Sequence, residues 1–182
     1  MASGRAATAA VVTFALPGIT MLGACADRSE RFVLLTAHEA QAVRALAARV
    51  LPSDDFGPGA EEAGAVHFID RALGRPEYAD KLRIVRTGLA DLDRRANAVH
   101  LQKTFASLSE NEQDQIILQV EGHEFFATAR ALVIVGVMAD PRYGGNRNHI
   151  GWATMDIQHR AVFTAPFGWY DANDTAPPRD AA

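Results

Sequence analysis

The residues best suited to chemistry or recognition are concentrated between positions 140 and 152. Arginine, asparagine, tyrosine and tryptophan side chains supply hydrogen-bond donors, acceptors and stacking surface there. The adjacent Gly144 and Gly145 carry no side chain, so another backbone, a sugar or a cofactor can approach them closely. Two roles remain open: a contact loop for a polyhydroxylated ligand or a protein, or a scaffold turn that closes a helical domain, with a capping Asp140 and with Trp152 covering the core. The candidate interface or substrate-proximal residues are Asp140, Arg142, Tyr143, Gly144, Gly145, Asn146, Arg147 and Trp152.

No complete catalytic, metal or cofactor motif accompanies this segment. His123 and Glu124 begin like a zinc-protease helix, but that motif needs a second histidine four residues after the first, and position 127 is alanine. Covalent haem attachment needs two cysteines, and the chain has one. A glycine-rich dinucleotide loop of the GxGxxG type is also missing. We therefore predict no catalytic residue, no metal and no cofactor in this chain itself.

The remaining polar candidates favour structural roles. The histidines are scattered, without the paired spacing that places two metal ligands on one helix face. Asp54 and Asp55 lie in a loop rich in Pro and Gly, where a carboxylate commonly accepts a hydrogen bond from the backbone two residues on. We expect this acidic pair to shape a turn rather than to act on a substrate.

The N-terminal segment differs in composition from the rest of the chain. After Arg5 there is no charged residue up to Ala26, which is the layout of a signal peptide and predicts that residues 1–25 direct export to the periplasm. The residues from Leu22 to Cys25 resemble a bacterial lipobox, in which Cys25 would be lipid-modified and would anchor the protein to the membrane. A plain cleaved signal with an incidental Cys25 is the alternative. A full membrane span fits poorly, because Thr, Pro and Gly interrupt the apolar run.

Hydrophobic periodicity predicts the elements that position the 140–152 segment. Thr36 and Ser109 are each followed three residues later by Glu, which is the capping-box signature of a helix start. The segment 125–138 is almost wholly apolar, which indicates a helix buried on most sides, although its β-branched residues leave a strand as the competing interpretation. The predicted helices span approximately residues 37–51, 63–73, 82–99, 109–120 and 125–138.

Length and composition are typical of one globular domain. Of the 182 residues, 48% are apolar and 22% are charged. We predict a mainly α fold, with a single domain of about five helices at residues 32–153. We also expect an irregular, Gly- and aromatic-rich tail at residues 154–182, and we predict that the segment after Asp140 is ordered only when a partner covers it. The net charge of -4, without a basic stripe, argues against nucleic acid as a partner.

Three stretches carry a resemblance to a known family. They are Leu51–Asp55 with Gly59 and Ala60, Ala63–Leu73, and Asp140–Trp152. Their order and spacing resemble the small (gamma) subunit family of gluconate 2-dehydrogenase and related flavin-dependent sugar dehydrogenases.

The resemblance implies an exported complex in which this chain binds a large flavoprotein of the glucose-methanol-choline (GMC) oxidoreductase type. FAD and the oxidation chemistry would belong to that large subunit, and a cytochrome c with haem c often serves as electron acceptor. Substrates in the family include gluconate and the 3-hydroxyl of glucosides. Family members usually carry a twin-arginine signal, whereas Arg5 is the only arginine before the apolar run here, so the resemblance leaves the export role open.

The leading hypothesis is therefore a non-catalytic small subunit of a periplasmic flavin-dependent sugar dehydrogenase, which supports its catalytic partner and its export. The alternative is an exported lipoprotein scaffold or binding module unrelated to redox chemistry. Contact with the membrane is expected only through a lipid anchor at Cys25.

Overall fold

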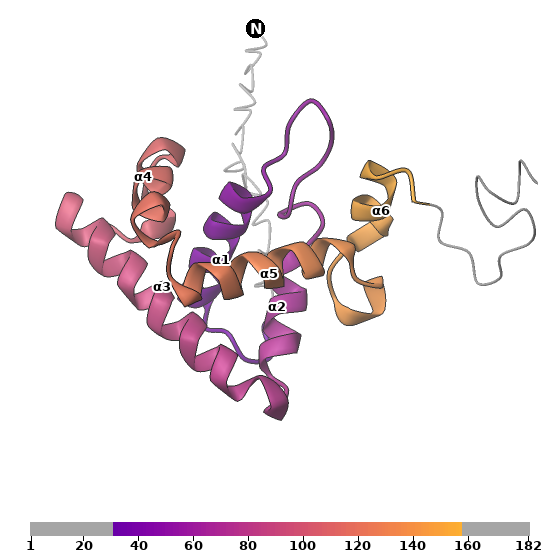
Figure 1. Ribbon diagram of the computed structural model, residues 1–182, viewed down its shortest axis with the longest axis horizontal. Coiled ribbons are helices and arrows are strands. Elements are labelled where there is room, and N and C mark those ends of the chain that lie inside the picture. The colour runs from indigo at the N-terminus through magenta and orange to yellow at the C-terminus, as the bar shows by residue number, and fades with distance from the viewer. Residues whose placement is uncertain (1–30, 158–182) are drawn as a thin grey trace, which may run out of the picture. The chain divides into compact units, whose positions relative to one another are not determined.

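The computed structural model describes residues 31–157, which form helices joined by short loops (Figure 1). The α-helices are α1 (Ala37–Val50), α2 (Ala65–Leu73), α3 (Ala79–Val99), α4 (Glu110–Val120), α5 (Glu124–Met138) and α6 (Ile150–Thr154). Single turns of 3-10 helix are η1 (Pro76–Tyr78), η2 (Phe105–Ser107), η3 (Pro141–Tyr143) and η4 (Arg147–His149). The predicted mainly α class is confirmed. The export signal, Cys25 and the tail from residue 158 onward lie outside the described residues.

The two predicted capping boxes begin α1 and α4. The hydroxyl of Thr36 accepts a hydrogen bond from the Glu39 backbone N–H at 3.1 Å, and the Glu39 carboxylate accepts one from the Thr36 N–H at 2.8 Å. At α4 the Glu112 carboxylate accepts hydrogen bonds from the hydroxyl and the backbone N–H of Ser109. Together with the contact of His100, these bonds lower the pKa of Glu112 to about 2. Both helix starts are therefore fixed by contacts within four residues, which a sequence pattern can report.

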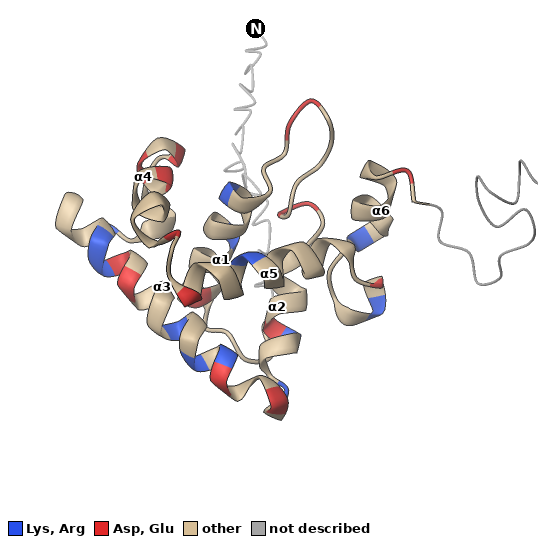
Figure 2. Cartoon of the chain, in the orientation of Figure 1, with Lys and Arg blue, Asp and Glu red and all other residues tan. Residues whose placement is uncertain are grey.

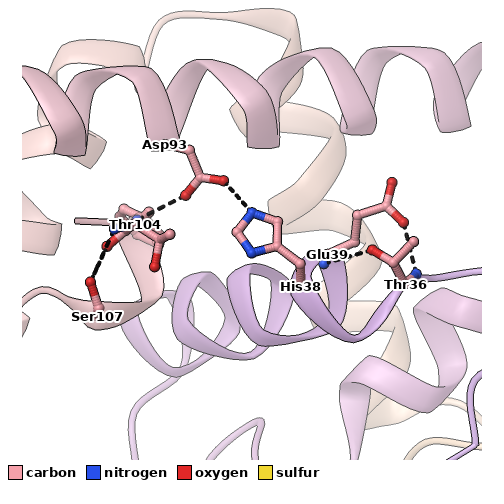
Figure 3. A network of polar contacts seen from close by, with 7 residues as sticks. Thr36, His38, Glu39, Asp93, Thr104 and Ser107 are labelled. Carbon is pink, nitrogen blue, oxygen red and sulfur yellow. Dashed lines mark hydrogen bonds and ion pairs between the residues drawn. The ribbon is translucent and has the colours of Figure 1, made fainter. Parts of the chain in front are cut away.

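A polar network ties three helical segments that are distant in sequence. In Figure 3, His38 on α1 points toward Asp93 on α3, and their Nε2 and Oδ2 atoms lie 2.7 Å apart. The other carboxylate oxygen of Asp93 accepts the Phe105 N–H of η2 at 2.9 Å. One side chain of α3 thus holds both α1 and the loop that precedes α4.

Helix α5 runs across the middle of the arrangement (Figure 1) and packs most extensively against α2 and α3. Gly88 lets α3 approach α5 closely, since a methyl group there would overlap the ring of Phe125. The buried side of α5 carries Phe125, Ala129, Leu132, Val133, Gly136 and Val137.

The opposite side of α5 faces solvent. The helix prediction for this segment is confirmed, but the expected burial on most sides is wrong, because Ile134 and Val135 are 40% and 48% exposed. Figure 2 shows that α5 carries few charges, so this exposed side is largely apolar. In the range 31–157, no helix is both long enough and apolar enough to span a membrane.

Candidate functional site

The 140–152 segment follows α5 and folds back along it. The Asp140 carboxylate accepts a hydrogen bond from the Arg142 N–H at 3.0 Å, so it caps η3 as the scaffold interpretation expected. Gly144 then ends η3 with a φ of 106°, in the left-handed region that glycine adopts without steric cost. The chain thereby turns back toward the last residues of α5.

Two glycines allow this segment to lie directly on α5. A methyl group at Gly145 would overlap the carbonyl oxygen of Gly136, and one at Gly151 would overlap that of Val137. The close approach predicted for Gly145 is thus made by the protein's own backbone. Both glycines are buried, so they hold the loop against α5 and do not themselves form part of an exposed surface.

Asn146 forms the most extensively bonded point of the segment and is fully buried. Its backbone N–H donates to the Gly136 carbonyl at 2.9 Å, and its side-chain amide donates to the Ala139 carbonyl at 3.0 Å. Its side-chain oxygen accepts the Gly151 N–H at 2.8 Å. Asn146 therefore satisfies backbone groups on both sides of the turn, of which the Gly151 N–H is buried and the Ala139 carbonyl partly buried.

Trp152 and Arg147 complete the attachment to the helices. The indole Nε1 of Trp152 donates to the Met138 carbonyl at 2.7 Å, and its ring stacks on His149 with centroids 5.0 Å apart. The backbone N–H of Arg147 donates to the Ala63 carbonyl at 3.0 Å, just before α2. The segment is consequently fixed to both α5 and the start of α2.

Arg142, Tyr143 and Arg147 present exposed side chains on this fixed support. The Arg142 guanidinium lies over the Tyr143 ring, 5.0 Å from its centroid. The Arg142 side chain is nevertheless 71% exposed, and Tyr143 is 47% exposed. An arginine stacked on a tyrosine has reduced freedom before any partner arrives, which lowers the entropic cost of binding. Of the eight candidate residues, these three are exposed, whereas Gly145 and Asn146 are buried and the other three are partly exposed.

Positive charge gathers where the segment meets α2. Burial, and after it the charges of Arg147, Arg44 and Arg71, lower the pKa of His67 to about 4 against the opposing effect of Asp70. The imidazole stacks on the ring of Phe32, with centroids 5.3 Å apart. His67 is thus neutral at pH 7, and arginines supply the positive charge of this region.

The low pKa of His67 predicts an acid-dependent loss of stability. An unfolded histidine binds its proton near pH 6.5, whereas folded His67 does so near pH 4. As pH falls from about 6.5 to about 4, protonation favours the unfolded chain, so the free energy of unfolding decreases through this window. Chemical denaturation at several pH values measures this effect. The free energy of unfolding should decrease less with falling pH in His67→Gln than in the wild type. The exposed His123→Gln variant is the control, and an equal decrease in all three proteins would contradict the assignment.

Asp70 on α2 is a buried polar residue to which sequence analysis gave no role. It is 2% exposed, and its carboxylate accepts backbone hydrogen bonds from Val33, Leu34 and Leu35 at 2.7 to 2.9 Å. Its position one residue after the buried Ile69 and four after Val66 placed it on the apolar face of the helix. A charge on that face was the signal that could have identified it.

Asp54, the first residue of the acidic pair in the loop before α2, has the predicted structural role. The Asp54 carboxylate accepts the Phe56 N–H at 2.8 Å, two residues on, which shapes the turn. Across residues 31–157, no three His, Cys, Asp or Glu side chains are arranged to hold a metal ion.

Comparison with known protein families gives a match. A family model described as gluconate 2-dehydrogenase subunit 3 matches residues 37–157, which include all six α-helices and the segment described above. Searches of curated proteins and of solved structures gave no match.

Proposed function

The chain belongs to the gluconate 2-dehydrogenase subunit 3 family of accessory subunits, and from this membership we propose that it is the non-catalytic small subunit of a periplasmic sugar dehydrogenase. In this proposal the chain binds and supports a large GMC-type flavoprotein that oxidises gluconate or the 3-hydroxyl of a glucoside. A cytochrome c accepts the electrons in some complexes of this kind.

In this proposal FAD belongs to the large subunit, as the family resemblance implies. A dinucleotide pyrophosphate is commonly held where a glycine-rich loop joins a strand to a helix. Residues 31–157 contain helices and an isolated bridge at Asp54 and Gly57, but no such strand–loop–helix unit. What this chain contributes to the reaction would then be the assembly and positioning of its partner.

The observation that carries the proposal is the combination of family membership with the built surface around η3. Arg142 and Tyr143 are exposed on a turn that Asn146 and Gly145 hold against α5, beside the exposed Val135. Arginine and tyrosine on a rigid support, next to apolar surface, are the composition that protein interfaces favour.

Co-purification tests the proposed function. A tag on the small subunit should isolate a large yellow flavoprotein together with dye-linked sugar dehydrogenase activity. Isolation of the full-length chain from its native host without a flavoprotein or such activity would leave a scaffold protein unrelated to redox chemistry as the better explanation.

Substitutions in the loop test where the partner binds. Truncating a central interface Arg or Tyr commonly weakens binding by about 1–4 kcal/mol. Arg142→Ala and Tyr143→Ala should therefore reduce the amount of co-purified flavoprotein and the activity that accompanies it. Arg94→Ala, on the exposed side of α3, is the control and should assemble like the wild type. Full assembly of both loop variants would remove this segment from the interface.

Export and lipid anchoring are proposed from the sequence of residues 1–25, which lie outside the described structure. In a bacterial host, fatty-acid labelling of the wild type and of Cys25→Ser would test the anchor. Loss of label and release of the variant into the periplasmic fraction are expected. Equal labelling would show that Cys25 is not the modified residue.

A further inference from the structure

A pocket of about 340 Å³ lies between α2, η1, the end of α5 and η3. Three arginines line it, Arg71 from α2, Arg75 just before η1 and Arg142 from η3, and Figure 2 shows basic residues in both the α2 and the η3 regions. Phe68 and Val135 supply apolar surface, and Tyr78 and Tyr143 supply aromatic surface. The pocket therefore combines cationic groups with an apolar wall.

The pocket carries more positive than negative charge. Arg75 pairs with Glu77 at 2.5 Å, and the Arg142 Nε lies 3.7 Å from the Asp140 carboxylate. Arg71 donates only a long hydrogen bond of 3.5 Å to the Arg142 carbonyl, and among residues 31–157 no carboxylate lies within ion-pair distance of it. Because the whole chain has a net charge of -4, this local excess of positive charge is distinct from the rest of the protein.

Aromatic and apolar groups extend the same surface. The Lys81 ammonium lies 4.5 Å from the centroid of the Tyr78 ring, which adds a further positive charge at the η1 side. Val135 and Tyr143 are 48% and 47% exposed, so the apolar wall continues onto the open side of α5. Guanidinium groups bind carboxylates in bidentate geometry, and apolar surface beside them suits the stem that carries the carboxylate.

We propose that this pocket receives an acidic peptide segment of the catalytic subunit, with a carboxylate paired to Arg71 and an apolar side chain packed on Phe68 and Val135. This inference rests on the proposed function. A peptide is favoured over a free small acid because the Arg75 and Arg142 side chains are 60% and 71% exposed, and ion pairs with such solvated groups are weak. A docked protein segment covers them and excludes water, which strengthens each charge-assisted hydrogen bond.

Charge reversal in the full-length complex tests the proposal. The complex is purified through a tag on the catalytic subunit, and its dissociation constant is measured by mass photometry over a dilution series. Arg71→Glu and Arg75→Glu should each raise the Kd about tenfold or more, and Arg71→Lys should raise it less. Arg83→Glu is the matched control, because Arg83 is a 72% exposed arginine of α3 outside the pocket. Increasing NaCl should weaken the wild-type complex more steeply than the charge-reversed ones.

The outcomes separate this inference from the proposed function. If the wild type binds its catalytic subunit and both reversed variants bind within twofold of it, the pocket is not the docking site although the proposed function stands. If the wild type binds no flavoprotein, the proposed function itself fails.

A third experiment adds sodium gluconate to the isolated full-length chain. A rise in Tm that Arg71→Glu abolishes would show a site for a free small acid and overturn peptide docking. Circular dichroism of each variant checks folding, and Arg75→Glu carries the test should Arg71→Glu unfold.

Discussion

Asp70→Ala is expected to destabilise the folded domain by about 3–5 kcal/mol, since it leaves one buried and two partly buried backbone donors without an acceptor. The carboxylate accepts the N–H groups of Val33, Leu34 and Leu35, and the Leu35 contact is buried. None of these residues belongs to a helix, so their N–H groups have no carbonyl of a preceding turn to bond. The substitution should release this segment from α2 as well as lower the free energy of unfolding.

Urea denaturation followed by circular dichroism measures the effect of Asp70→Ala. The free energy of unfolding of Asp70→Asn should lie between those of Asp70→Ala and the wild type. The asparagine amide keeps one acceptor oxygen but turns a donor toward the other N–H groups. Asp80→Ala is the surface control, since the Asp80 side chain is 94% exposed, and it should stay within about half a kcal/mol of the wild type. A loss below about 1 kcal/mol for Asp70→Ala would show that water replaces the carboxylate at these groups.

Asn146→Ala is expected to cost about 3 kcal/mol and to loosen the 140–152 segment. Removal of the side chain leaves the Ala139 carbonyl and the Gly151 N–H without partners, in a region where Asn146 itself has no exposed surface. Arg142 and Tyr143 would then lose the support that fixes their direction. Assembly with the flavoprotein should weaken along with stability, although neither exposed side chain has been changed.

Asn148→Ala provides a matched control for this prediction. Asn146 and Asn148 both have left-handed backbones, with φ of 44° and 54°, so alanine incurs a similar backbone penalty at each position. Asn148 is exposed, and only Asn146 makes the buried hydrogen bonds. Thermal unfolding and hydrogen exchange of residues 140–152 should therefore respond much more to Asn146→Ala. Equal responses would mean that the backbone conformation, and not the buried amide, stabilises the turn.

The sequence alone determined the elements whose causes lie within a few residues. The caps at Thr36 and Ser109 and the step of three and four residues along α3 each depend on contacts inside one helix. The turn at Asp54 likewise depends on a local contact, with the backbone N–H two residues on. The helical class of the domain followed from these local patterns. The resemblance carried by the 51–60, 63–73 and 140–152 stretches agrees with the family match at residues 37–157.

The tertiary structure alone decided which faces are covered and which side chains meet. The pattern of α5 shows an apolar helix, but burial depends on the neighbours available, and those neighbours leave Ile134 and Val135 exposed. Gly145 is small because Gly136 lies against it, which no periodicity in either segment reports. Arg71 and Arg142 line one pocket although 71 residues separate them in the chain. Such pairings arise from the packing of whole helices. The contacts that stabilise them join residues distant in sequence, so a local sequence pattern does not contain them.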